Sequence, residues 1–364
     1  MSRFLQLHLL AFVPPSNLNR DDTGRPKTAV VGGATRLRIS SQSLKRAWRT
    51  SDVFRNALQG HMGERTQRIG EVIHAHLLQR GVPPERALKI TREIVPVFGA
   101  IKPEKDKDPT HTEQLAFVSP EEKAAAIAWA EGLNAGERVK PEPKDILRRT
   151  DTAADIALFG RMLAGSPDYN REAAAQVAHA ITTHRITVED DYYTAVDDLK
   201  TRAENAGTGF VGEAAFGSGV FYMYFCVNRA LLEKNLEGDA DLAGRAIGAL
   251  VEAAATVAPR GKQNSFAAHY RAGYILAERG DAQPRTLAGA FGKPVVGEDL
   301  MMSSIMALKS FRQALDAAYG PASESALALN VHSKFVGEPS MVASLREDAP
   351  QADTLGEIVA FCRG

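Results

Sequence analysis

The residues from Arg36 to Arg49 have types and a spacing that suit phosphate binding. The segment reads Arg-Leu-Arg-Ile-Ser-Ser-Gln-Ser-Leu-Lys-Arg-Ala-Trp-Arg. The alternation at its start predicts a short strand, residues 36–39, with Arg36 and Arg38 on one face. Ser40 or Ser41 is then a suitable N-cap for a helix. Backbone N–H groups at a helix start, combined with guanidinium groups, are a recurrent means of holding phosphates.

The helix that follows is predicted to be amphipathic. Residues spaced i, i+3, i+4 and i+7 share one side of a helix. Four polar or cationic residues have this spacing: Gln42, Lys45, Arg46 and Arg49. Apolar residues occupy the opposite side: Leu44, Ala47 and Trp48. The segment therefore predicts a cationic helix face backed by an apolar one.

The positive charge is local. The whole chain has 44 basic and 44 acidic residues, so net charge alone predicts no nucleic-acid partner. Between Asn19 and Arg49, however, basic residues outnumber the acids Asp21 and Asp22 by six. A focused basic patch on a neutral protein indicates binding of a polyanion along a defined path. The alternative is a solvated helix face that pairs with acids from elsewhere in the chain.

Asp21 and Asp22 are the one serious catalytic candidate. Adjacent carboxylates beside a phosphate-binding patch could hold Mg²⁺ and support hydrolysis of a nucleic-acid strand. Two adjacent acids without a third ligand make a poor magnesium site. The competing interpretation is that they pair with Arg20 or Arg25, or cap the following turn.

Two other motifs predict no site. Residues 207–212 match G-x-G-x-x-G, but a dinucleotide site needs a strand before the motif and a helix opening inside it. His179 and His184 have no cysteine or acidic partner at zinc spacing, so we expect core or hydrogen-bonded histidines. Neither a cofactor nor a bound metal is predicted.

Composition indicates an ordinary globular protein. At 364 residues the chain has room for about two domains. Cys226 and Cys362 are its only cysteines, which fits a reducing compartment, and we expect a cytoplasmic protein. The longest apolar run outside the N-terminus, residues 220–227, is too short to span a bilayer, so no membrane partner is expected.

The predicted elements follow an α+β plan. Strands are expected at residues 3–13, ended by Pro14-Pro15, at 36–39, 180–190, 220–228 and 271–277. Helices are expected at 41–58 and 239–258, with a mainly helical block over 60–175. Residues 197–219 should project as a long hairpin or loop between two strands. Without the inserts the order is β-α-β-β-α-β, the ferredoxin-like plan of RNA-recognition modules.

Five blocks of residues resemble one known family. The first is Leu18-Asn19-Arg20-Asp21-Asp22 with Gly32-Gly33 and residues 36–47. The others are residues 155–162, 178–184, 194–199 and 218–222. In this order they resemble CasC, the backbone subunit of the type I-E CRISPR Cascade complex.

The resemblance implies a hand-shaped, RRM-like subunit. Its palm would comprise residues 1–59, 176–196 and 220–364, its helical fingers 60–175 and its thumb hairpin 197–219. Copies would stack head to tail along one CRISPR RNA and present the spacer for pairing with target DNA. Other Cascade subunits and a recruited helicase-nuclease would be further partners. The subunit itself would not be an enzyme.

The resemblance also implies the site residues. RNA contacts would come from Asn19, Arg20, Lys27, Arg36, Arg38, Ser40, Ser41, Gln42, Ser43, Lys45, Arg46, Arg49 and Met162. The thumb would displace one RNA base at intervals with Phe210, Val211 or Phe216. Type III backbone subunits suggest an alternative, in which Asp21 or Asp22 cleaves paired target RNA as a metal-dependent ribonuclease.

Overall fold

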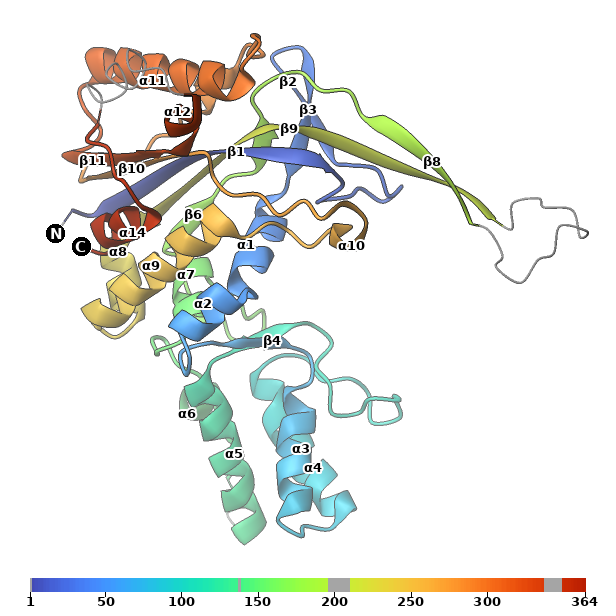
Figure 1. Ribbon diagram of the computed structural model, residues 1–364. Helices are drawn as coiled ribbons and strands as arrows, with labels where there is room; N and C mark the ends of the chain where they lie inside the picture. Colours follow the sequence, from blue (N-terminus) through green and yellow to red (C-terminus); the bar gives the residue numbers. More distant parts are fainter. Residues whose placement is uncertain (1, 137–138, 196–209, 337–348) are drawn as a thin grey trace, which may run out of the picture.

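The computed structural model describes residues 2–136, 139–195, 210–336 and 349–364. It has three parts: a body built on a large sheet, a helical lobe below it, and a two-stranded arm that projects sideways (Figure 1). The body contains strands from both ends of the chain, so the lobe and the arm are excursions from it.

The sheet of the body is antiparallel, in the order β11-β10-β1-β9-β7-β3-β2, and β6 and β8 also pair with β9. Its strands are β1 (Phe4–Ser16), β2 (Thr28–Val31), β3 (Ala34–Ile39), β6 (Ala175–Val177), β7 (Ala180–Thr182), β8 (Glu189–Ala195), β9 (Phe210–Asn228), β10 (Tyr274–Gly280) and β11 (Ser325–Asn330). A mixed α/β protein with a large antiparallel sheet agrees with the predicted α+β class.

The first strand is longer than predicted. β1 pairs with β9 in one register from Phe4 to Val13, and the register then shifts before Ser16 pairs with Gly217. Pro14 and Pro15 lie within this irregularity. Because proline has no N–H to give to a ladder, the two prolines interrupt the pairing without ending the strand.

Helices cover both faces of the sheet. Odd-numbered residues of β1 such as Leu5, Leu7 and Leu9 pack in one core with α9 (Ala240–Thr256) and α14 (Leu355–Arg363). Leu10 points to the other face and packs in a second core with α11 (Leu300–Tyr319). The remaining helices of the body are α1 (Ser41–Arg49), α2 (Asp52–Ala57), α7 (Ala154–Phe159), α8 (Arg229–Asn235), α10 (Gln263–Phe266) and α12 (Val331–Val336).

The lobe has its own core. It contains α3 (Ile69–Gln79), α4 (Pro84–Ile94), α5 (Pro120–Ala135) and α6 (Pro143–Ile146), with β4 (Glu64–Thr66) paired to β5 (Ala116–Val118). Short 3₁₀ turns occur at Val95–Val97, Pro167–Tyr169 and Ala288–Phe291. Buried ion pairs lie where the chain returns from the lobe: Arg161 binds Glu122 and Arg171 binds Asp151.

The arm is a hairpin of β8 and the first part of β9. Its register runs from Glu189 opposite Phe216 to Ala195 opposite Phe210, and every residue of β8 is exposed. The hairpin therefore begins at Glu189, before the predicted start at residue 197. Residues 196–209, which include most of the predicted thumb, lie outside the described residues. In the described part of the chain, no helix has the length and apolarity needed to cross a membrane.

Candidate nucleic-acid interface

The start of α1 has the predicted geometry. Ser40 is extended, and its hydroxyl accepts a hydrogen bond from the backbone N–H of Ser43 at 3.3 Å, so it is the N-cap. Leu44 and Trp48 are fully buried, and the Trp48 ring packs 5.7 Å from that of Phe225 on β9. This anchoring directs the opposite, cationic helix face away from the core.

The predicted helix over residues 41–58 is in fact two helices. The Thr50 hydroxyl donates to the Arg46 carbonyl at 2.8 Å, and the Ser51 hydroxyl accepts from the N–H of Phe54 at 3.2 Å. Ser51 is thus the N-cap of α2. The helix ends here because hydroxyl side chains compete for backbone hydrogen bonds.

Asn19 joins the preceding loop to the start of α1. Its side-chain oxygen accepts from the N–H of Ser40 at 2.8 Å, and its carbonyl accepts from the N–H of Lys27 at 2.8 Å. The Lys27 carbonyl in turn accepts from the N–H of Arg38 at 2.8 Å. These bonds bring Arg20, Lys27, Arg38 and the first turn of α1 to one place, as the sequence predicted.

Arg36 requires a correction. Its side chain is fully buried and donates to the carbonyls of Thr182 at 2.8 Å and Phe291 at 3.1 Å. Burial lowers the pKa of its guanidinium. The predicted RNA contact is therefore wrong for Arg36, because the turn at Ala288–Phe291 covers that end of β3.

Arg38 lies on the same face of β3 but is only half-buried. Its guanidinium donates to Nδ1 of His179 at 2.9 Å. Burial lowers the pKa of His179, and the nearby charges of Arg38 and Lys27 lower it further. The charges of Arg38 and Lys27 both act on this imidazole, which indicates a positive local potential.

Lys45 is a cation with no counter-ion among the described residues. It is half-buried on α1, and burial alone lowers the pKa of its ammonium. It forms no ion pair within the part of the chain that the structure describes. Its neighbours on the same surface, Gln42 and Arg46, are exposed, and Ser41 and Ser43 are half-buried. A desolvated ammonium of this kind gains from an incoming anion.

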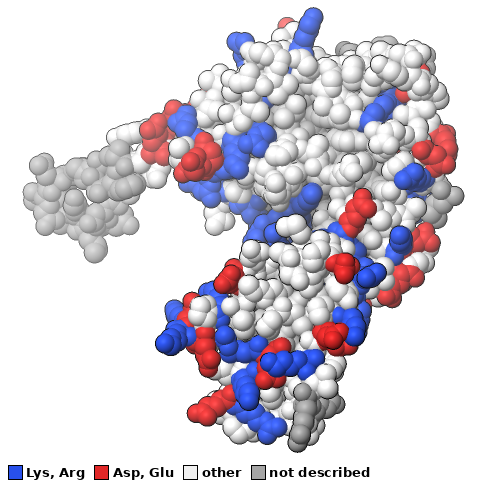
Figure 2. Space-filling view, turned by 180° about the vertical axis from the view of Figure 1, so that it is seen from behind, with Lys and Arg blue, Asp and Glu red and all other residues white. Residues whose placement is uncertain are grey.

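Arg49 and Met162 lie where the body meets the lobe. Arg49 pairs with the buried Asp155 at 3.3 Å, and its guanidinium lies 5.2 Å from the centre of the Phe117 ring. Met162 is 78% exposed and follows Arg161, which donates to the Phe117 carbonyl at 3.0 Å. Figure 2 shows that Lys and Arg side chains gather on the concave side between body and lobe.

Asp21 caps a turn. Its Oδ1 accepts from the N–H and the hydroxyl of Thr23 at 2.9 and 2.8 Å and from the N–H of Arg25 at 3.0 Å. The Thr23 hydroxyl is the main cause of the lowered pKa of Asp21. Asp22 is exposed. Among the described residues, the one cluster of possible metal ligands is Glu71, Asp108 and His111 in the lobe, and neither aspartate of the loop belongs to it.

Phe216 is half-buried in the arm near the body. Its ring lies 6.0 Å from that of Phe266 on α10. The side chains of Phe210 and Val211 lie outside the described residues, so the choice of a base-displacing residue stays a prediction.

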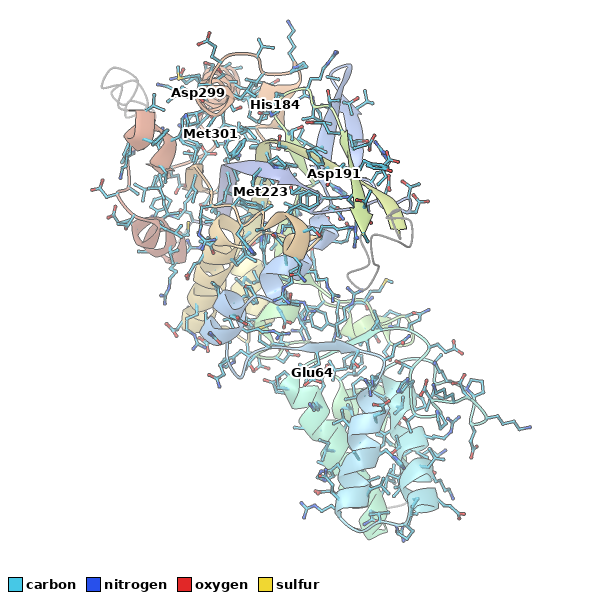
Figure 3. The ribbon with its side chains drawn as sticks, turned by 45° about the vertical axis from the view of Figure 1, so that its right-hand side comes forward. Glu64, His184, Asp191, Met223, Asp299 and Met301 are labelled. Carbon is cyan, nitrogen blue, oxygen red and sulfur yellow. The ribbon has the colours of Figure 1, made fainter. Side chains whose placement is uncertain are left out.

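A cavity of about 510 Å³ lies elsewhere. His184, Asp299 and Met301, labelled in Figure 3, are among the residues that line it. It opens on the α11 side of the sheet, whereas α1 packs on the other side. The cavity is therefore separate from the basic surface.

Arg260 and Lys262 were not predicted, although the sequence carries a signal for them. Residues 253–277 contain three cationic residues and no acidic one. The turn that carries Arg260 and Lys262 lies against Leu18, beside the loop described above.

The antiparallel sheet and the basic concave surface define a mixed α/β protein with a surface suited to polyanions. The chain belongs to the CT1975-like protein family, whose model matches residues 5–357. No curated protein matches it.

Two solved structures are similar along the entire chain. One, titled "CRISPR RNA-guided surveillance complex, pre-nicking", has 29% sequence identity and a TM-score of 0.84, and the match covers 99% of this chain and 100% of that chain. Another, titled "CRISPR RNA-guided surveillance complex", has 24% identity and a TM-score of 0.63, with 98% and 99% covered; it supports the fold alone. The predicted resemblance to a subunit of such complexes is confirmed, whereas the CasC subtype stays a prediction.

Proposed function

We propose that this protein is a CasC-type backbone subunit that binds CRISPR RNA in a Cascade surveillance complex. One observation carries the proposal: half-buried Lys45, which forms no ion pair with any described residue, lies on a helix whose N-cap is bonded to the Asn19 loop. Lys and Arg side chains gather on the concave side between body and lobe (Figure 2). The likeness over 99% of the chain to a subunit of a CRISPR RNA-guided complex supports the same conclusion.

The arrangement suits binding without sequence readout. A scaffold for many different spacers must contact phosphates and leave base edges free for pairing. The surface offers cations, hydroxyls and a helix N-terminus, all of which bind phosphates. We therefore expect similar affinity for unrelated RNA sequences.

The proposed architecture is an RRM-like palm with fingers and a thumb. The adjacent strands β10-β1-β9-β7, with α1 between β1 and β7 in the chain and α9 between β9 and β10, support a ferredoxin-like palm. The lobe corresponds to the fingers and the arm to the thumb. The same proposal includes head-to-tail stacking of copies and pairing of the bound RNA with target DNA. It also includes contacts with other Cascade subunits, recruitment of a helicase-nuclease and a cytoplasmic location.

The proposed role is non-catalytic. It is supported by Asp21, whose carboxylate is already used by three donors of its own turn. Incubation of the assembled complex with complementary RNA and Mg²⁺ tests this point. If the RNA is cut at regular intervals and the cuts disappear in Asp22→Ala, the protein is a ribonuclease and the non-catalytic role is rejected.

RNA binding itself is tested by Lys45→Ala, with Lys234→Ala as the matched control. Lys234 is exposed on α8 and has no place in the proposed track. Binding of two unrelated single-stranded RNAs is measured over a range of salt. Loss of one phosphate contact should lower the slope of log affinity against log salt by about 0.7 for both RNAs. An unchanged slope in Lys45→Ala, or a loss for one sequence only, would contradict the proposal.

A further inference from the structure

The turn around α10 holds an unusual backbone conformation. Lys262 and Ala267, which flank the helix, have φ of 52° and 49°, in the left-handed region that side chains other than glycine rarely adopt. The Gln263 side-chain amide donates to the carbonyls of Pro259 at 3.0 Å and Ala268 at 3.2 Å. These bonds connect the two ends of the turn and maintain the strained conformation.

The turn presents polar and cationic side chains to solvent. Arg260, Asn264 and Ser265 are exposed, and Lys262 is half-exposed. Because residues 253–277 contain no aspartate or glutamate, no acid of the same segment neutralises these cations. Within the described ranges, neither Arg260 nor Lys262 forms an ion pair with another part of the fold.

The turn lies directly against the loop that leads to α1. A Cβ built on Gly261 would lie 2.3 Å from the Leu18 carbonyl oxygen, so the two backbones are in close contact and the position requires glycine. Leu18 precedes Asn19, which accepts the hydrogen bond from Ser40. The Arg260–Ser265 turn and the start of α1 therefore both contact one short loop.

The same turn contacts the arm. The Phe266 ring lies 6.0 Å from that of Phe216, and Figure 1 shows α10 beside the end of β1, between α1 and the arm. A strand of RNA that passes along α1 toward the arm would thus pass this turn.

We propose that the Arg260–Ser265 turn is a second phosphate-binding element of the RNA track, in which Arg260 and Lys262 contact backbone phosphate oxygens. The inference rests on the proposed RNA-binding function and adds a site that is distant in the sequence from residues 19–49. Its ligand is the sugar-phosphate backbone of a single strand, bound without regard to base sequence. Arg260 offers a planar fork to a phosphate, and Lys262 a single charge.

The test compares charge removal with charge retention. Lys262→Gln and Arg260→Gln remove one cation each, Lys262→Arg keeps the charge, and Lys234→Gln on α8 is the matched control. Full-length protein is titrated with two unrelated fluorescent single-stranded RNAs at several salt concentrations, and thermal unfolding is recorded for each variant.

Each charge-removing variant should lower the salt slope by about 0.7. If wild type and variant bind equally at ~1 M salt, the variant should bind about fourfold more weakly than the wild type at ~0.15 M. The loss should be equal for both RNAs. Lys262→Arg should retain the wild-type slope, and Lys234→Gln should change nothing.

Two results would overturn the inference. If Lys262→Gln and Arg260→Gln bind normally while Lys45→Ala binds weakly, the turn is not part of the track although the protein binds RNA. If Lys262→Gln and Lys262→Arg lose affinity and melting temperature alike, the turn has a structural role. If Lys45→Ala also binds normally, the proposed function itself fails.

Discussion

Individual cations of one short segment have different roles in this protein. Arg36 and Arg38 have the same side-chain direction on β3, yet only Arg36 is enclosed. Its guanidinium donates hydrogen bonds to the carbonyls of Thr182 and Phe291 inside the fold. Lys45, in contrast, has no described partner, so its charge is available to a ligand.

The different burial of Arg36 and Arg38 predicts unequal effects of two matched substitutions on stability. Arg36→Gln should lower the free energy of unfolding by on the order of 3 kcal/mol, because it removes charged hydrogen bonds inside the fold. Arg38→Gln should change it by less than about 0.5 kcal/mol. Chemical denaturation measures both values. A normal stability for Arg36→Gln, together with a reduced salt slope for RNA, would restore the original prediction for this residue.

Asp155 predicts a pH dependence of stability. Burial raises its pKa to about 6, although the N–H of Gly63 and the charge of Arg49 oppose the shift. The folded state therefore holds a proton between about pH 4 and pH 6 that the unfolded chain has released, so this group contributes less stability as the pH rises through that window. Above about pH 6 its contribution is constant.

The measurement compares the wild type with Asp155→Asn, which keeps an oxygen to accept from Gly63. Between pH 4 and pH 6 the wild type should lose about 2 kcal/mol of unfolding free energy relative to the variant. A parallel pH profile of the two proteins would show that Asp155 titrates normally.

At the scale of elements, two serine caps allow a controlled comparison. Ser40 caps α1 and Ser51 caps α2 in the same way. Ser40→Ala and Ser51→Ala should each cost about 1 kcal/mol of stability. Only Ser40→Ala should also weaken RNA binding, because α1 and not α2 carries the proposed phosphate contacts. Equal effects of both variants on RNA affinity would assign the loss to general destabilisation.

Spacing within a few residues predicts the cap and the buried face of α1, whereas contacts between distant segments leave no local signal. The cap at Ser40 and the buried face of α1 follow from spacing within a few residues, and both are confirmed. The burial of Arg36 depends on Thr182 and Phe291, more than a hundred residues away, and no local pattern encodes that contact. The pairing across Pro14-Pro15 likewise depends on the partner strand β9. The Arg260–Ser265 turn lies beside the Asn19 loop through the contact of Gly261 with Leu18, more than two hundred residues away in the chain, and no local pattern encodes that contact either.

At the scale of the molecule, the arm should be separable from the stability of the body. All residues of β8 are exposed, so replacing residues 192–213 by a short turn, which keeps the Arg25–Asp190 ion pair and the buried Ala215, should leave thermal unfolding of the free protein nearly unchanged. The same variant should disturb the regular spacing of proteins along RNA. Nuclease protection of assembled complexes measures this spacing, with the Lys234→Ala protein as control. An unaltered protection pattern would contradict the thumb assignment.

β9 is a single strand of 19 residues that belongs to both the arm and the centre of the sheet. At about 3.3 Å per residue it is a beam roughly 60 Å long. Its inner half is hydrogen-bonded on both edges, to β1 on one side and to β6 and β7 on the other, and is therefore held rigidly in the sheet. A tilt of about 10° where the strand leaves the sheet would displace the outer end of the described hairpin by roughly 4 Å, about the separation of neighbouring strands. The stiffness of the central sheet therefore sets how accurately the arm is aimed.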